Sequence, residues 1–186
     1  MFKNAQGKVL LLSLPLILLA VGGCPTQNPD DFPPLETAFD VDIERYAGKW
    51  YEIAKYPVSF ESGCVDVTAD YTLLDDGTVR VVNTCGSPDG GSRQIVGSAT
   101  VTDPSTNAKL SVSFFGPLFA APYWIIELDD DYQYAVVGEP SREFLWILSR
   151  TPTLDETTLA GILGRLPDRG YDPDLLTWTE QSTATP

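Results

Sequence analysis

Apolar and polar residues alternate strictly from Val65 to Leu73, with apolar side chains at odd positions and Asp or Thr at even positions. A period of two places one set of side chains on each face of a β-strand, so this segment predicts a strand with one buried and one hydrated face. The triplet Asp75-Asp76-Gly77 follows and is typical of a hairpin turn. In the next segment Val81 and Asn83 share a face, which predicts the second strand of a hairpin.

Similar short segments recur along the chain and are separated by turns such as 87–92 and 103–107. They predict strands at about 49–56, 65–73, 79–83, 93–101, 109–114, 123–129, 132–138 and 143–149, and a short strand at 175–180 that pairs with the first. Short strands at regular spacing indicate an all-β antiparallel barrel or sandwich. Alternation alone does not choose between the two, and in 123–129 it does not assign the faces.

The last long strand, 143–149, is apolar on both faces, so an element must cover its outer face. A helix that starts at Thr153, with Thr as its cap and acids in its first turn, is the expected cover. Its apolar stripe has helical spacing and consists of Leu159, Ile162, Leu163 and Leu166. A shorter helical turn is expected at 42–48, closed by glycine.

The amino terminus divides into three parts. Residues 1–23 contain Lys3, Lys8 and an apolar run over 9–21 that is too short for a comfortable membrane span, which predicts an export signal. Residues 24–40 are polar and proline-rich and predict a flexible tether that begins with Cys24. The folded domain is expected over 41–186.

Composition excludes several function classes. The chain of 186 residues contains no histidine, which removes the usual general base and the commonest metal ligand, and no metal site or cofactor is predicted. Its formal net charge is −14, and it becomes −16 without residues 1–23, which carry two of the 12 basic residues. Such a charge disfavours nucleic acid as a partner. The run Asp129-Asp130-Asp131 lacks a calcium-loop pattern and is expected to be a hydrated turn.

Several motifs together resemble the lipocalin family. Gly48-x-Trp50 opens the first strand and Arg150 ends the last barrel strand. The segments 50–56, 112–117, 121–125 and 145–152 are similar to those of bacterial outer-membrane lipoprotein lipocalins and their animal relative apolipoprotein D. The resemblance covers about residues 41–181.

This resemblance implies an eight-stranded antiparallel up-and-down β-barrel with one flanking helix. Trp50 is expected to plug the closed end of the barrel, and Arg150 to cover it through a cation–π contact. The sequence Val21-Gly22-Gly23-Cys24 resembles a bacterial lipobox, which implies cleavage before Cys24 and lipidation of its thiol. Pro25 after the cysteine favours the outer membrane, with the domain facing the periplasm.

The inside of such a barrel is the expected binding surface for a small hydrophobic ligand, such as a fatty acid or lysophospholipid. Alternation and resemblance together predict a lining of Tyr46, Val67, Ala69, Tyr71, Val81, Asn83, Val112, Phe114, Tyr123, Trp146 and Leu148, and alternation alone adds Leu110. Each of these residues also suits a filled core. The apolar segment 116–122 is expected to rim the opening, although it suits packing on the domain or a homodimer contact as well.

The sequence gives few indications of which residues bind the polar end of a ligand. Tyr71, Asn83, Tyr123, and Glu52 or Glu127 are candidates to bond a head group. No inward cation is predicted unless Arg80, Arg93 or Lys109 lies at the mouth.

Cys64 and Cys85 are expected to form a disulfide, because an exported protein enters an oxidising compartment. Pairing about Asp76 places Cys64 opposite residue 88, so the bridge requires a bulge or bend. The rival interpretation is a catalytic thiol, which lacks a histidine to activate it.

Three functions fit these features. The first is a lipid-anchored, non-enzymatic carrier of a small hydrophobic ligand. The others are an enzyme for an apolar substrate and a structural envelope lipoprotein with a filled barrel.

Overall fold

The structure is a computed structural model that describes residues 32–182. The predicted signal and residues 24–31 of the predicted tether, including Cys24, lie outside this range. Within the described range, no helix is both long and apolar enough to cross a membrane.

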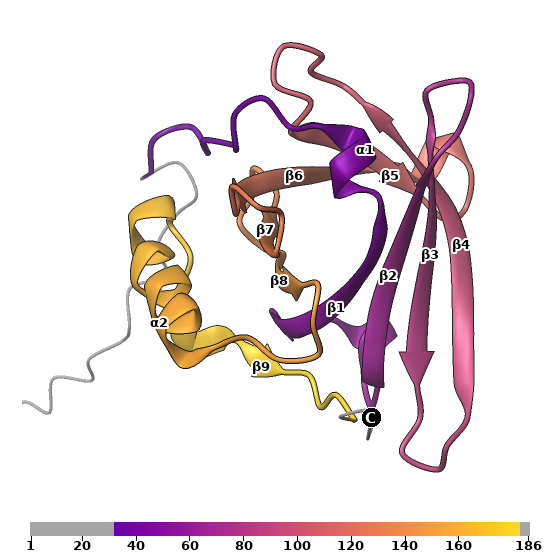
Figure 1. The fold of residues 1–186 in the computed structure, drawn as a ribbon, viewed down its shortest axis with the longest axis vertical. Helices are drawn as coiled ribbons and strands as arrows, with labels where there is room; N and C mark the ends of the chain where they lie inside the picture. Colours follow the sequence, from indigo (N-terminus) through magenta and orange to yellow (C-terminus); the bar gives the residue numbers. More distant parts are fainter. Residues whose placement is uncertain (1–31, 183–186) are drawn as a thin grey trace, which may run out of the picture.

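Eight antiparallel strands close into a barrel (Figure 1), which confirms the predicted fold class. Each strand pairs with its neighbour in sequence, and β1 closes the barrel by pairing with both β8 and β2. The strands are β1 (Gly48–Lys55), β2 (Val65–Leu73), β3 (Val79–Gly86), β4 (Ser92–Val101), β5 (Lys109–Ser113), β6 (Ala121–Leu128), β7 (Tyr134–Gly138) and β8 (Leu145–Ser149). The predicted last strand is β9 (Thr177–Trp178), which pairs with the end of β1.

The C-terminal segment fills the place where β1 and β2 diverge. β2 pairs with β1 only over Gly48–Tyr51, and β9 occupies the same edge of β1 at Ala54 and Lys55. Between them, Gln181 Nε2 donates to the carbonyls of both Glu52 and Val67 at 2.8 Å. The chain end therefore satisfies backbone groups that the diverging strands leave unpaired.

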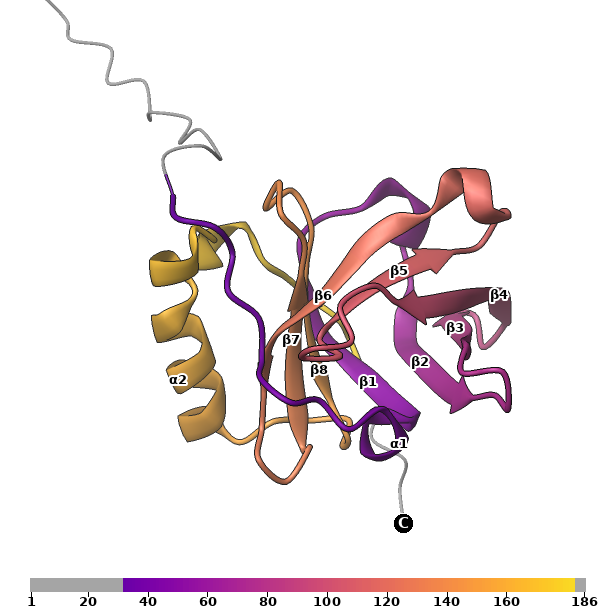
Figure 2. The same ribbon diagram turned by 90° about the horizontal axis from the view of Figure 1, so that it is seen from above.

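Helix α2 (Glu156–Arg165) covers the outer face of β7 and β8, on the side of the barrel away from β2–β4 (Figures 1 and 2). Leu145 and Ile147 of β8 are buried outside the barrel against Ile162 and Leu166. This packing explains why both faces of β8 are apolar, as the sequence predicted. The predicted cap was wrong: Asp155, not Thr153, accepts a hydrogen bond from Thr158 N at 2.9 Å.

Other boundaries shift for local reasons. Helix α1 (Ile43–Tyr46) ends before Gly48, which instead opens β1 with φ +93°. Strand β7 begins two residues later than predicted, because the Asp129 carboxylate accepts hydrogen bonds from Asp131 N and Gln133 N and holds a turn there. Short 3-10 turns η2 (Ser59–Glu61), η3 (Pro117–Phe119), η4 (Pro167–Arg169) and η5 (Pro173–Leu175) occupy loops.

Trp50 and Arg150 seal one end of the barrel beside α1. Trp50 is fully buried, and its Nε1 donates to Tyr46 O at 2.8 Å. The guanidinium carbon of Arg150 lies 3.8 Å from the centroid of the Trp50 ring. The guanidinium also donates to the carbonyls of Arg45, Tyr46 and Lys49 at 2.7–3.1 Å. One side chain thus joins α1, β1 and the end of β8.

We expect Arg150→Ala to lower the free energy of unfolding by about 2–4 kcal/mol, because it removes the cation–π contact and leaves several carbonyls without their donor. Urea unfolding followed by circular dichroism measures the loss. Arg80→Ala, which removes an exposed arginine from β3, is the control and should change stability little. Equal losses in the two variants would contradict the assigned role of Arg150.

Candidate ligand-binding cavity

The barrel encloses a cavity of about 330 Å³ that opens at the end opposite α1. Its walls are mainly aromatic and aliphatic. Apart from residues named below, the lining includes Thr68, Ala121 and Pro122. A cavity of this size and character suits one small apolar ligand.

The structure places all but two of the predicted lining residues, Tyr46 and Leu110, on this wall. The lining includes Val67, Ala69, Tyr71, Val81, Asn83, Val112, Phe114, Tyr123, Trp146 and Leu148. Tyr46 lies outside the lining and contacts it through a hydrogen bond between its hydroxyl and that of Tyr123, 2.7 Å away. Leu110 is packed in the core and is not part of the wall.

Three tyrosine hydroxyls form a polar group inside the barrel. The Tyr123 hydroxyl lies 2.7 Å from that of Tyr46 and 2.8 Å from that of Tyr71. Burial raises the pKa of Tyr71 to about 12 and raises the pKa of the other two well above their usual value. All three therefore remain neutral at physiological pH.

The mouth of the cavity has an apolar rim, which we define as Phe60, Phe115, Leu118, Phe119 and Phe144. Phe115, Leu118 and Phe119 are 75%, 92% and 70% exposed. All rim residues except Leu118 also line the cavity. The segment 116–122 thus borders the opening instead of packing on the domain.

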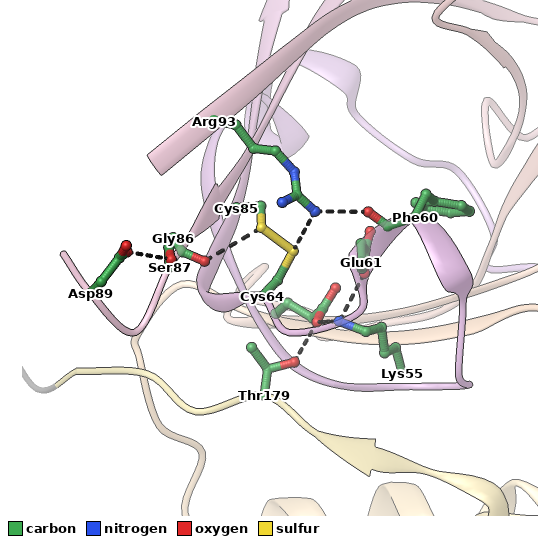
Figure 3. The surroundings of a disulfide bond; sticks show 11 residues. Lys55, Phe60, Glu61, Cys64, Cys85, Gly86, Ser87, Asp89, Arg93 and Thr179 are labelled. Atoms are coloured by element: carbon green, nitrogen blue, oxygen red, sulfur yellow. Dashed lines mark hydrogen bonds and ion pairs between the residues drawn. A yellow bond between two sulfur atoms is a disulfide. The ribbon is translucent and has the colours of Figure 1, made fainter. Parts of the chain in front are cut away.

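A disulfide fixes one side of the mouth (Figure 3). Cys64 and Cys85 are bonded with Cα atoms 5.2 Å apart, which confirms the predicted pair and excludes a free thiol at either position. The predicted bulge is present: the β2–β3 register shifts between Val65 and Thr68. Arg93 extends from β4 and donates to Phe60 O at 3.1 Å, which ties the rim to the barrel wall.

A buried ionic group on β1 was not predicted. Lys55 Nζ lies 2.5 Å from Glu52 Oε1 and 2.8 Å from Glu61 Oε2, and all three side chains are largely buried. In a regular strand, residues 52 and 55 would face opposite sides. The β1–β8 register shifts between Glu52 and Ala54, however, and this irregularity lets both side chains reach the same group. No local pattern in the sequence predicts this register shift or the ionic group that depends on it.

Burial raises the pKa of Glu52 to about 7, and repulsion from Glu61 adds to the rise. Hydrogen bonds from Lys55 and from the Thr179 hydroxyl oppose it without cancelling it. The charge of this cavity wall therefore changes near neutral pH.

The alternative acidic candidate for the head group, Glu127, was wrong. Glu127 lies outside the cavity, where it pairs with Arg165 and Arg169 and accepts from the Tyr134 hydroxyl. A register shift in β6 between Ile125 and Glu127 accounts for its placement and for the ambiguous alternation there.

None of the three proposed cations lines the cavity. Arg80 is exposed on β3, and Arg93 binds the loop of Phe60. Lys109 lies over the Trp124 ring at 4.6 Å and pairs with Asp103. Within residues 32–182, no group of three potential metal-ligating side chains is present.

A closed barrel with one open end and an apolar interior defines the class of small-ligand-binding calyx proteins. Comparison with known proteins supports assignment to this class. A family model described as a lipocalin-like domain matches residues 41–181. The chain belongs to this lipocalin family.

Its relatives come from plants, bacteria and animals. Temperature-induced lipocalin-1 of Arabidopsis thaliana is 42% identical over 82% of this chain and 86% of its own length. Outer membrane lipoprotein Blc of Escherichia coli K12 is 40% identical over 90% of this chain and 97% of its own length. Apolipoprotein D of Mus musculus is 38% identical over 87% and 84%.

Solved structures share the fold at lower identity. Insecticyanin from Manduca sexta superimposes with a TM-score of 0.66 and 22% identity, over 82% of this chain and 87% of that one. Lobster apocrustacyanin A1 gives a TM-score of 0.62 and 20% identity, over 83% and 93%. Family membership supports binding of a small hydrophobic ligand.

The raised pKa of Glu52 predicts that stability falls as pH rises from about 4.5 to about 7. In this window the folded state holds a proton that the unfolded state has lost, so raising the pH favours unfolding. We expect a loss on the order of 2 kcal/mol. Urea unfolding at several pH values measures it.

Glu52→Gln should abolish most of this slope, whereas Glu36→Gln, at an exposed site before α1, should keep it. The exposed aspartates with lowered pKa values, such as Asp76 and Asp155, act only at lower pH. An unchanged slope in Glu52→Gln would refute the assignment.

Proposed function

We propose that this protein binds and carries single-chain hydrophobic ligands, such as fatty acids or lysophospholipids, in the bacterial envelope. The observation that carries the proposal is the open apolar cavity, whose lining includes ten of the residues predicted from sequence. Each methylene removed from water contributes ~0.8 kcal/mol, so a chain of about sixteen supplies ~13 kcal/mol, of which about 8 kcal/mol remains when association costs about 5 kcal/mol. This is the scale of micromolar affinity. A binding role without catalysis agrees with the family.

We further propose that lipidated Cys24 anchors the protein to the outer membrane, with the domain facing the periplasm. Relatives named outer membrane lipoproteins support this location. The placement of residue 32 bears on the orientation of an anchored domain. The Phe32 ring lies 5.4 Å from the guanidinium carbon of Arg142, which also donates to Pro33 O at 2.6 Å. Arg142 belongs to the β7–β8 loop, in which Glu139 and Phe144 line the cavity. The preceding tether thus joins the domain on the side where ligand enters.

Titration of the purified protein with lysophospholipid and fatty acid, followed by tryptophan fluorescence, tests the binding proposal. Trp146 lines the cavity, so saturable quenching should be largely lost in Trp146→Phe. We expect Ala69→Phe to weaken binding at least tenfold, because its ring occupies the space of the ligand.

Thr72→Phe adds the same ring to an exposed position of β2 and serves as the control. Binding that survives in Ala69→Phe would place the ligand outside the barrel. Absence of binding to every apolar ligand would favour a structural lipoprotein, and turnover of a bound ligand would favour an enzyme. Sedimentation of the free and ligand-bound protein tests the predicted homodimer through the apolar rim.

A further inference from the structure

The charge of the cavity wall points to the chemistry of the ligand's polar end. Among the lining residues, the carboxylate side chains are Glu52, Glu61 and Glu139, and no lysine or arginine is present. The nearby ammonium of Lys55 is already shared by Glu52 and Glu61, at 2.5 and 2.8 Å. Two carboxylates around one ammonium leave an excess negative charge whenever both are ionised. An anionic head group would therefore meet like charge with no available counter-ion.

The hydrogen-bond acceptors of the wall also favour a ligand whose polar end donates hydrogen bonds. Asn83 Oδ1 is buried and accepts no hydrogen bond within the described structure. Glu61 Oε2 lies 2.8 Å from the Lys55 ammonium, which it shares with Glu52, so its negative charge is only partly compensated. A buried acceptor without a donor costs about 1–3 kcal/mol, which a ligand that donates hydrogen bonds would recover. Both residues line the cavity, and because the two oxygens have almost no exposed surface, a bound ligand reaches them after a small side-chain rotation.

The remaining polar groups do not offset this bias. The Glu139 carboxylate is occupied by Ser141, Glu143 N and Phe144 N, at 2.7–3.2 Å, and so it organises the β7–β8 loop. The tyrosine hydroxyls carry three protons and make two mutual hydrogen bonds, which leaves one neutral donor. The Asn83 amide and the Thr68 hydroxyl are further neutral donors on the wall. Neutral donors can bind a carboxylate, but they do not neutralise its charge.

We propose that the cavity selects single-chain amphiphiles whose polar end donates hydrogen bonds and carries no net negative charge, such as an ammonium or a hydroxyl, and disfavours the corresponding carboxylate. Asn83 and Glu61 are the residues that accept hydrogen bonds from this end. The inference rests on the proposed binding function and narrows its ligand: ionised fatty acids become the weaker candidates.

Three ligands with the same twelve-carbon chain test the inference: dodecylamine, dodecanol and laurate. Each is titrated into the purified protein at pH 7.5, below its aggregation concentration, with tryptophan fluorescence as the readout. The ammonium and the carboxylate both lose hydration on entry, so their ratio reports the charge of the wall, and the alcohol provides an uncharged reference. We expect dodecylamine to bind at least tenfold more tightly than laurate.

Two variants connect the preference to its residues. Glu61→Gln should reduce the amine-to-laurate ratio at least fivefold. Asn83→Leu, of similar size, should weaken the amine and the alcohol more than laurate. Glu44→Gln removes a carboxylate from exposed α1 at the closed end and should leave the ratio unchanged. Ala69→Phe blocks the cavity, so the signal that persists in it measures amine attracted to the acidic surface and is subtracted.

The outcomes separate the inference from the proposed function. Equal affinities for amine and laurate, or a ratio unaffected by Glu61→Gln in a folded variant, would overturn the inference and leave the binding function intact. Laurate as the tightest ligand would do the same. Failure of all three ligands to bind would overturn both.

Discussion

The barrel depends on a single strand, β1, which must pair on both edges for the sheet to close. Its first half pairs with β2, and its second half pairs with β8 and β9. Closure forces β1 and β2 to diverge toward the mouth, and the C-terminal segment fills the resulting gap through Gln181. The same strand has a register shift beside Glu52 and holds the buried Lys55. The shape of the cavity wall and the buried Glu52–Lys55 ion pair, in which the pKa of Glu52 is raised, therefore both arise from β1.

The closed end and the mouth meet opposite physical demands. At the closed end, Arg150 satisfies carbonyls from several segments while its face covers Trp50, so few polar groups remain unpaired. At the mouth, the apolar rim stays exposed, and Asn83 Oδ1 lacks a donor. These are the features expected where ligand contacts will replace missing protein contacts, since buried unpaired polar groups and large exposed aromatics both oppose folding of the empty protein.

Local patterns predicted most of the fold, because they depend on neighbours in sequence. The alternation in 65–73 assigned Val67, Ala69 and Tyr71 to the cavity, and the stripe of α2 identified its buried face. Register shifts could not be predicted, because an extra residue in β1 or β6 is fixed by the partner strand and not by the sequence around it. For this reason alternation missed Lys55 and misjudged Glu127, the two residues next to these shifts.

The geometry of the N-terminal segment constrains how an anchored domain would sit on a membrane. The described chain starts at Phe32 beside the mouth, and residues 24–31 span at most about 30 Å when fully extended. The eight residues of β1 rise about 26 Å along the strand, which is about 20 Å along the barrel axis because barrel strands are tilted. With lipid on Cys24, the mouth can reach the membrane surface easily, whereas contact through the closed end would consume most of the tether. The apolar rim and the attachment point therefore favour the same orientation, with the cavity open toward the source of hydrophobic ligand.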